Sequence, residues 1–243
     1  MDDARSRLQW ASSRRTTRPE DIAYSLFGIF NLHLPVLYGE SAENALGRLL
    51  AEIISQSGEI SVLDWVGEAS TFHSCFPAHI TSYRTLPLSP HHQPDAEERA
   101  STMGEKFTPS KALRKLHDSL AKSPLPRFIN RRLILPCLVH RVTMVQLKKR
   151  CTYEIQASGL RPLEIALPHE LENADNVASQ STGTEATSAE HVILTLGRPF
   201  NALLLTKLPH DEYKRIASST LIVAQPVDSA SLLQSKIRTF TIV

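Results

Sequence analysis

Apolar residues recur at three- and four-residue spacing early in the chain, which is the pattern of a helix with one buried face. Thr17 occupies the expected N-cap position, Glu20 completes a capping box three residues later, and Pro19 fits the first helical turn. The sequence therefore predicts a helix that starts near Thr17 and buries a face made of Ile22, Ala23, Leu26, Ile29 and Phe30.

A second helix is predicted after a turn. Pro35 disfavours helix at the residue before it, and Gly39 supplies the tight turn. Ser41 is a good N-cap, and Gly58 stands where a C-cap glycine belongs. Between these two caps, two adjacent apolar rows predict a buried stripe: Ala45, Leu49 and Ile53, then Leu46, Leu50 and Ile54. The alternation in residues 60–66 predicts a short strand.

The character of the chain changes after residue 69. Residues 70–110 contain five prolines and little apolar periodicity, which predicts an extended connection, and a short helix is expected after Ser110. From Pro126 onward the pattern favours strands, in six runs: residues 127–147, 151–167, 191–197, 201–208, 219–227 and 236–243. A polar Ser/Thr/Ala/Glu tract near residues 172–190 predicts a disordered loop.

Together these elements predict an α+β fold. A helical unit over residues 1–68 precedes a proline-rich linker with a short helix over residues 69–125, and residues 126–243 form a β-rich domain. Strands without alternating helices favour an antiparallel sandwich or barrel-like arrangement over a parallel sheet.

The composition is that of a globular protein with no global charge signal. The chain has 42% hydrophobic and 21% charged residues and a formal net charge of +2, so nothing global indicates nucleic acid or a membrane surface. Its three cysteines include no C-x-x-C pair and are odd in number, which favours a reducing compartment. We find neither the apolar core of a signal peptide nor a membrane-length apolar run, so we expect a cytoplasmic protein.

The sequence contains none of the common catalytic or cofactor motifs. The nine glycines form no dinucleotide or phosphate loop, and G-x-S-x-G is absent, so we predict no catalytic residue and no cofactor. The nearest approach to a metal site is the loop with His73, Cys75 and His79. Zinc needs four ligands, usually two separated pairs, so we expect no metal here but a half-buried Cys75 between surface histidines.

Charged residues suggest two further sites, and a structural explanation is preferred for each. The basic cluster at residues 131–150 has few aromatic neighbours for base stacking, so a solvated face is favoured over nucleic-acid binding. This cluster comprises Arg131, Arg132, His140, Arg141, Lys148, Lys149 and Arg150. Glu20 and Asp21 suit the first turn of a helix. Arg18 and Glu40 are expected to form a buried ion pair that holds the turn against the helix.

Residues 10–41, WASSRRTTRPEDIAYSLFGIFNLHLPVLYGES, closely resemble the segment that follows the HET (heterokaryon incompatibility) domain in fungal vegetative-incompatibility proteins. Ser41 departs from that pattern, where a second glycine is usual. The later segments LPCLVHRV, GRPFNALLL, DEYKRIASSTLIVAQ and IRTFTIV carry a weaker resemblance. The matching positions are Trp10, Ala11, Arg14, Thr16, Thr17, Arg18, Glu20, Asp21, Ala23, Tyr24, Ser25, Leu26, Gly28, Ile29, Phe30, Leu37, Tyr38, Gly39 and Glu40.

The resemblance implies a non-catalytic regulatory or interaction module in non-self recognition and cell-death signalling. The HET domain, credited in the family with triggering cell death, is expected to be missing from a truncated chain. A protein partner is implied, a HET domain in cis or in trans, with neither nucleic acid nor membrane. The structural or interface residues implied are Trp10, Arg18, Glu20, Tyr24, Leu26, Phe30, Tyr38, Gly39 and Glu40.

Two alternatives remain open on the sequence. A nucleotide-cleaving death effector would need an acidic and aromatic pocket, for which Tyr24, Tyr38 and Glu40 are the loose candidates. Calorimetric titration with NAD and ATP would separate this enzyme from an interaction module. A nucleic-acid-binding module, the less favoured alternative, would show steep salt dependence on a DNA column.

Overall fold

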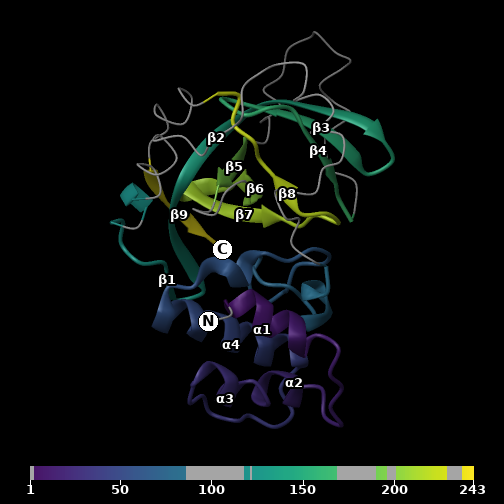
Figure 1. Cartoon of the computed structure of the whole chain (residues 1–243), viewed down its shortest axis with the longest axis vertical. Helices are drawn as coiled ribbons and strands as arrows, with labels where there is room; N and C mark the ends of the chain where they lie inside the picture. The colour runs from purple at the N-terminus through teal and green to yellow at the C-terminus, as the bar shows by residue number, and fades with distance from the viewer. Residues whose placement is uncertain (1–2, 86–117, 121, 169–189, 196–200, 229–236) are drawn as a thin grey trace, which may run out of the picture.

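The structure is a computed structural model that describes residues 3–85, 118–120, 122–168, 190–195, 201–228 and 237–243. Helices occupy one end of the molecule and a large sheet the other (Figure 1). The predicted α+β class, with helices before strands, is confirmed. The predicted helix after Ser110 lies outside the described residues except for 118–120, which are helical, and so does the predicted loop except for Glu190.

The first part of the chain forms three short helices. Helix α1 (Ala4–Ala11) is capped by Asp3 and buries Leu8. Helices α2 (Asp21–Tyr24) and α3 (Phe27–Phe30) replace the single helix predicted from Thr17, and α3 ends at Asn31 in the left-handed conformation. The predicted capping box is wrong, because Glu20 has helical backbone angles at the N-cap of α2 and its side chain makes no cap hydrogen bond.

Helix α4 (Ala42–Ser57) is predicted correctly at both ends. The Ser41 side chain accepts a hydrogen bond from the Asn44 N–H, and Gly58 closes the helix with φ +66°. Both predicted apolar rows are buried. The two ends and the buried face of α4 could be predicted because caps and helical stripes depend on residues that are close in sequence.

Residues 60–83 differ from the prediction. Residues 60–66 are not a strand but contain the 3₁₀ turn η1 (Ile60–Leu63), and a second such turn, η2, spans Ile80–Tyr83. Residues 70–83 do not form the extended connection that the sequence predicts, because Phe76 and Tyr83 are fully buried. Cys75 is completely buried and His73 is buried too, so the expected half-buried thiol between surface histidines is wrong; only His79 is exposed.

The strands of the C-terminal part are β1 (Arg127–Ile129), β2 (Arg132–Lys149), β3 (Thr152–Ala157), β4 (Leu163–Ala166), β5 (His191–Thr195), β6 (Asn201–Lys207), β7 (Glu212–Ile216), β8 (Ile222–Val223) and β9 (Ile237–Ile242). The 3₁₀ turn η4 (Pro209–Asp211) precedes β7. The nine strands form one sheet, and the long β2 reaches from the helical end to the hairpin with β3 (Figure 1).

Part of the sheet closes on itself. Strand β2 pairs with β5, β5 with β6, β6 with β7, β7 with β9, and β9 again with β2. These five strands form a closed, barrel-like ring, as one of the predicted arrangements required. The sheet is not purely antiparallel, however, because β7 and β9 run parallel.

Two apolar cores use opposite faces of the central strands. Val192 and Leu194 of β5 belong to a core shared with the helices, whereas Ile193 between them belongs to a second core against β3 and β4. This explains the continuous apolar runs of β5 and β6, because a strand buried on both faces needs no polar alternation. The first core includes helical Leu8 and strand residue Leu133, so it crosses the boundaries predicted at residues 68 and 125.

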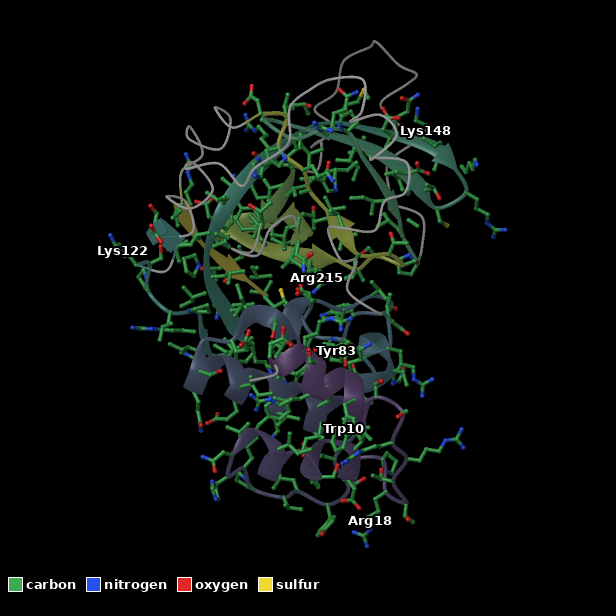
Figure 2. The ribbon with its side chains drawn as sticks, viewed as in Figure 1. Trp10, Arg18, Tyr83, Lys122, Lys148 and Arg215 are labelled. Carbon is green, nitrogen blue, oxygen red and sulfur yellow. The ribbon has the colours of Figure 1, made fainter. Side chains whose placement is uncertain are left out.

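A buried arginine joins the strands to the loop after α4. Arg215 of β7 donates through Nη1 to the Leu63 carbonyl (2.8 Å) and through Nη2 to the Trp65 carbonyl (3.1 Å), and it stacks on the Trp65 ring at 3.9 Å. The Trp65 Nε1–H donates to the Cys75 carbonyl (2.8 Å). Figure 2 shows Arg215 between the two halves, with Tyr83 in the helical half.

The end of β9 is held by residues 73 and 74. His73 Nε2 lies 3.0 Å from the Ile242 carbonyl, and its Nδ1 accepts from the Cys75 N–H at 3.1 Å. The Ser74 hydroxyl donates to the Val243 carbonyl. His73 is therefore placed to donate through Nε2 and accept through Nδ1, a pattern that only the neutral ring can satisfy.

The burial of His73 predicts that the stability of the fold depends on pH. Burial first, and the charge of Arg131 further, lower the pKa of His73 from its ordinary 6.5 to about 4, against the opposing Ile242 hydrogen bond. Because the unfolded chain then binds more protons, the contribution of His73 to stability is constant above about pH 6.5 and is lost as the pH drops toward 4. We expect His73→Gln to flatten this loss in urea titrations between pH 7.5 and 4.5. An unchanged slope in the variant would contradict the assignment.

Candidate interaction surface

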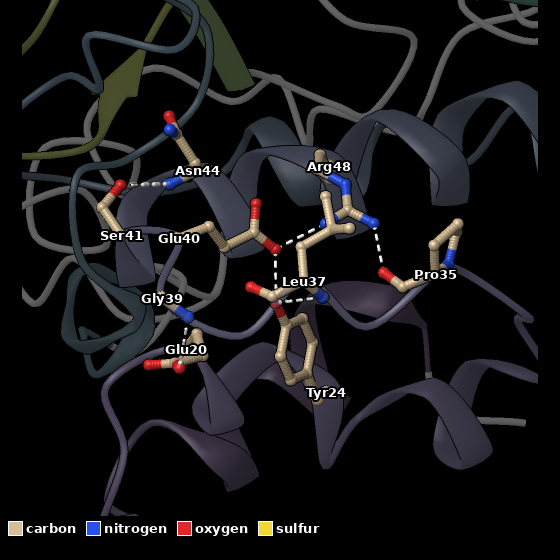
Figure 3. Close-up of polar contacts among 9 residues, drawn as sticks. All are labelled: Glu20, Tyr24, Pro35, Leu37, Gly39, Glu40, Ser41, Asn44 and Arg48. Atoms are coloured by element: carbon tan, nitrogen blue, oxygen red, sulfur yellow. Dashed lines mark hydrogen bonds and ion pairs between the residues drawn. The ribbon is translucent and has the colours of Figure 1, made fainter.

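The turn over residues 35–39 is held between side chains of two helices, Tyr24 of α2 and Arg48 of α4 (Figure 3). The Tyr24 hydroxyl of α2 donates to Glu40 Oε1 (2.5 Å) and accepts from the Leu37 N–H (3.1 Å). It also lies 2.9 Å from the Leu37 carbonyl oxygen, an alternative acceptor for its one proton. Partial burial, then the Glu40 hydrogen bond, raise the pKa of Tyr24, so the phenol remains a donor at neutral pH.

Two further side chains complete this network. Glu20 Oε1 accepts from the Gly39 N–H (3.1 Å), and the N–H groups of Glu20 itself and of Gly39 lower the pKa of this carboxyl. Arg48 of α4 binds Glu40 through Nη1 and the Pro35 carbonyl through Nη2. Gly39 has φ +90°, a conformation that favours glycine.

The predicted ion pair between Arg18 and Glu40 is wrong. Glu40 pairs with Arg48, which α4 brings to the turn from eight positions away, and the Arg18 side chain is exposed. The Arg18 guanidinium instead stacks on the Tyr38 ring at 4.6 Å. Arg48 was missed because its partners become neighbours only when α4 packs beside the turn.

The side chains of the held turn point outward. Val36 is 45%, Leu37 51% and Tyr38 67% exposed. Trp10, at the end of α1, is 59% exposed and carries the Arg14 guanidinium on its ring at 3.6 Å. We call residues 36–38, whose side chains are exposed, the apolar turn. The sequence offered Trp10 and Tyr38 as interface residues, and both are accessible for contact.

The remaining predicted residues of this region lie beneath that surface. Leu26 is completely buried, as predicted, whereas Phe30 is only half-buried. Phe30 lines a pocket of about 270 Å³ together with Leu32 and Ile53. Figure 1 places α2 and α3 at the end of the helical half that lies farthest from the sheet.

The His73 loop and the basic cluster are the other candidate sites from the sequence. Within the described ranges, no three His, Cys, Asp or Glu side chains group in the manner of metal ligands. In the basic cluster His140 is buried rather than solvated, and its Nδ1 lies 2.9 Å from the Ser158 carbonyl. Ion pairs join Arg132 to Glu212, Arg141 to Glu190 and Lys148 to Glu154. None of the helices in the described part of the chain has the length and apolarity needed to cross a membrane.

Part of this chain is similar to a protein of fungal vegetative incompatibility. That protein is vegetative incompatibility protein HET-E-1 of Podospora anserina, to which 52 residues, 21% of this chain, are 56% identical. The matched stretch spans 4% of the length of that protein. No family model matches the chain, and no solved structure matches it.

Proposed function

We propose that this chain is a non-catalytic docking module in fungal incompatibility signalling. It would bind a protein partner through the apolar turn and Trp10, and a HET domain in cis or in trans is the partner that the resemblance in residues 10–41 favours. The similarity to HET-E-1 supports the connection with vegetative incompatibility.

One observation carries the proposal: the backbone of the apolar turn is fixed while its side chains are exposed. Tyr24 and Arg48 bind the carbonyls and N–H of the turn, and Glu20 binds the Gly39 N–H. A loop that is ordered before binding loses less conformational entropy on docking. Exposed apolar side chains on such a loop are typical of a contact surface.

The same contacts disfavour the alternative of a nucleotide-cleaving enzyme. The Tyr24 hydroxyl donates a hydrogen bond to Glu40 Oε1, and the negative charge of Glu40 is compensated by its ion pair with Arg48. A general acid or base needs a free path from its titrating atom to the substrate. Here the Tyr24 hydroxyl is bound to Leu37 and Glu40, and Glu40 Oε1 is bound to Tyr24 and Arg48.

The proposal can be tested by growth of fungal cells that express this chain alone, a HET domain alone, or the two fused. We expect cells that express the chain alone to grow normally. Cells that express the fusion should survive to a different extent from cells that express the HET domain alone. Replacing Val36, Leu37 and Tyr38 by serine in the fusion should restore the behaviour of the HET domain alone.

The matched control replaces three exposed apolar residues of the strand-rich part, Met144, Leu147 and Val227, by serine. This variant should behave as the unchanged fusion. Killing by the chain alone would overturn the non-catalytic assignment. A fusion that behaves as the HET domain alone would overturn the docking role.

Removal of one hydroxyl should loosen the apolar turn. Tyr24→Phe deletes the hydrogen bonds to Glu40 and Leu37, which should cost about 0.5–1.5 kcal/mol. We expect faster hydrogen exchange in residues 31–41, measured by mass spectrometry, with little change in α4. Tyr213→Phe, whose ring packs against Phe240, is the control. Unchanged exchange in residues 31–41 would show that Tyr24 does not hold the turn.

A further inference from the structure

A short exposed stretch beside the apolar turn carries a concentrated positive charge. Every residue from 13 to 19 is exposed, and this stretch contains Arg14, Arg15 and Arg18 but no acidic residue. The neighbouring arginines of α1 are engaged with the protein: Arg5 is buried, and Arg7 donates to the Ile29 carbonyl. We call residues 13–19, with the rings of Trp10 and Tyr38, the arginine ribbon.

Two of these arginines lie over exposed rings. The guanidinium carbon of Arg14 lies 3.6 Å from the centroid of the Trp10 ring, and that of Arg18 lies 4.6 Å from the centroid of the Tyr38 ring. A guanidinium that stacks on a ring keeps its N–H donors in the plane of the fork, where they can bind a carboxylate with two parallel hydrogen bonds. Stacking also restricts the side chain, which reduces the entropy lost when an anion binds.

The backbone of the ribbon is fixed near both ends. The Arg14 N–H donates to the Ala11 carbonyl (3.0 Å), and the Thr16 hydroxyl donates to the Arg18 carbonyl (2.6 Å). Figure 2 labels Trp10 and Arg18 in the helical half, with Arg18 at the end remote from the sheet. The eight residue-to-residue steps from Trp10 to Arg18 span at most about 29 Å, the reach of a short extended peptide.

The positive charge of the ribbon is not neutralised by ion pairs within the described residues. Those ion pairs involve Arg48 in the helical half and cations of the sheet such as Arg132 and Arg141, but not the three ribbon arginines. Arg18 helps to lower the pKa of Glu20, but the Glu20 carboxylate binds the Gly39 N–H rather than a ribbon arginine. The ribbon is thus complementary to a negatively charged partner.

We propose that the arginine ribbon binds an acidic segment of the protein partner. Carboxylates would pair with Arg14, Arg15 and Arg18, and apolar side chains of the segment would lie on Trp10 and Tyr38. A protein segment is favoured over nucleic acid because three cations make a small electrostatic footprint, and the chain carries a net charge of only +2. This inference rests on the proposed docking function and names the chemistry of the partner.

The direct test is fluorescence anisotropy with a labelled twelve-residue peptide of alternating glutamate and leucine. We expect saturable binding that weakens with salt. The variant R14Q/R15Q/R18Q should bind at least about tenfold more weakly. Trp10→Ala with Tyr38→Ala should also weaken binding. The charge-matched control K149Q/R150Q/R161Q changes three exposed cations of the strand-rich part and should bind normally.

Several results would overturn the inference. These are absence of binding to the acidic peptide, equal binding of the glutamine analogue, or an equal loss in the charge-matched control. Tighter binding of a twelve-residue oligothymidylate would assign the ribbon to nucleic acid instead. Self-association in light scattering that R14Q/R15Q/R18Q abolishes would assign it to a second copy of the chain.

The growth assay separates this inference from the proposed function. If the serine variant of the apolar turn abolishes the effect of the fusion while R14Q/R15Q/R18Q does not, only the acidic-segment inference fails. If neither variant changes the effect of the fusion, the docking function itself fails.

Discussion

Replacement of Arg215 by leucine is expected to lower the free energy of unfolding by about 3–5 kcal/mol, the cost of breaking a buried charged network. The Trp65 carbonyl would lose its arginine donor, whereas the Leu63 carbonyl would keep only the Trp65 N–H, and an unsatisfied buried carbonyl costs about 1–3 kcal/mol. The Trp65 ring would lose its stacked cation. Asp64, which is buried and feels the Arg215 charge, would lose that compensation.

Chemical denaturation followed by fluorescence would measure this loss, with Arg215→Lys and Arg132→Leu as comparisons. Lysine keeps the charge but cannot reach two carbonyls with a planar fork, so an intermediate loss is expected. Arg132 forms an exposed ion pair with Glu212, worth less than about 1 kcal/mol. If Arg215→Leu loses no more stability than Arg132→Leu, the contacts of the buried arginine do not stabilise the packing of the strands against the helical part.

Arg215 also explains why strand β7 was missed from the sequence. In residues 212–216 the pattern is broken by an arginine whose side chain points into the core, so no apolar alternation is visible. The partners that make its burial possible are carbonyls of residues 63, 65 and 75, about 140–150 positions away. Strands β5 and β6 were predictable because burial on both faces leaves a continuous apolar run.

Of the candidate surface, the sequence named Trp10 and Tyr38 as interface residues, but not Val36, Leu37 or the contacts of Arg48 that hold the turn. Ser41 and Gly58 were assigned correctly because a cap depends on the few residues beside it. Glu20 was assigned to a local cap, whereas its side chain reaches the Gly39 N–H, 19 positions away. Only the packing of α2 against α4 decides such competition between a local and a distant partner.

Replacement of Leu26 by alanine is expected to cost about 2–5 kcal/mol, because the side chain is completely buried between α2 and α3. For a chain of this length, each kcal/mol should lower the melting temperature by about 2–4 °C. Val36→Ala, on the exposed apolar turn, should change stability by less than about 0.5 kcal/mol.

The Leu26 variant also tests whether the docking surface depends on the core beneath it. Leu26 lies two residues after Tyr24, whose hydroxyl holds the turn, so a cavity there should displace the donor and weaken binding of the acidic peptide. Calorimetry and anisotropy on the same samples separate the two effects. An unchanged melting temperature would show that α2 and α3 do not unfold with the rest of the chain. Lost stability with unchanged peptide binding would show that the network of Glu20, Glu40 and Arg48 maintains the turn without Leu26.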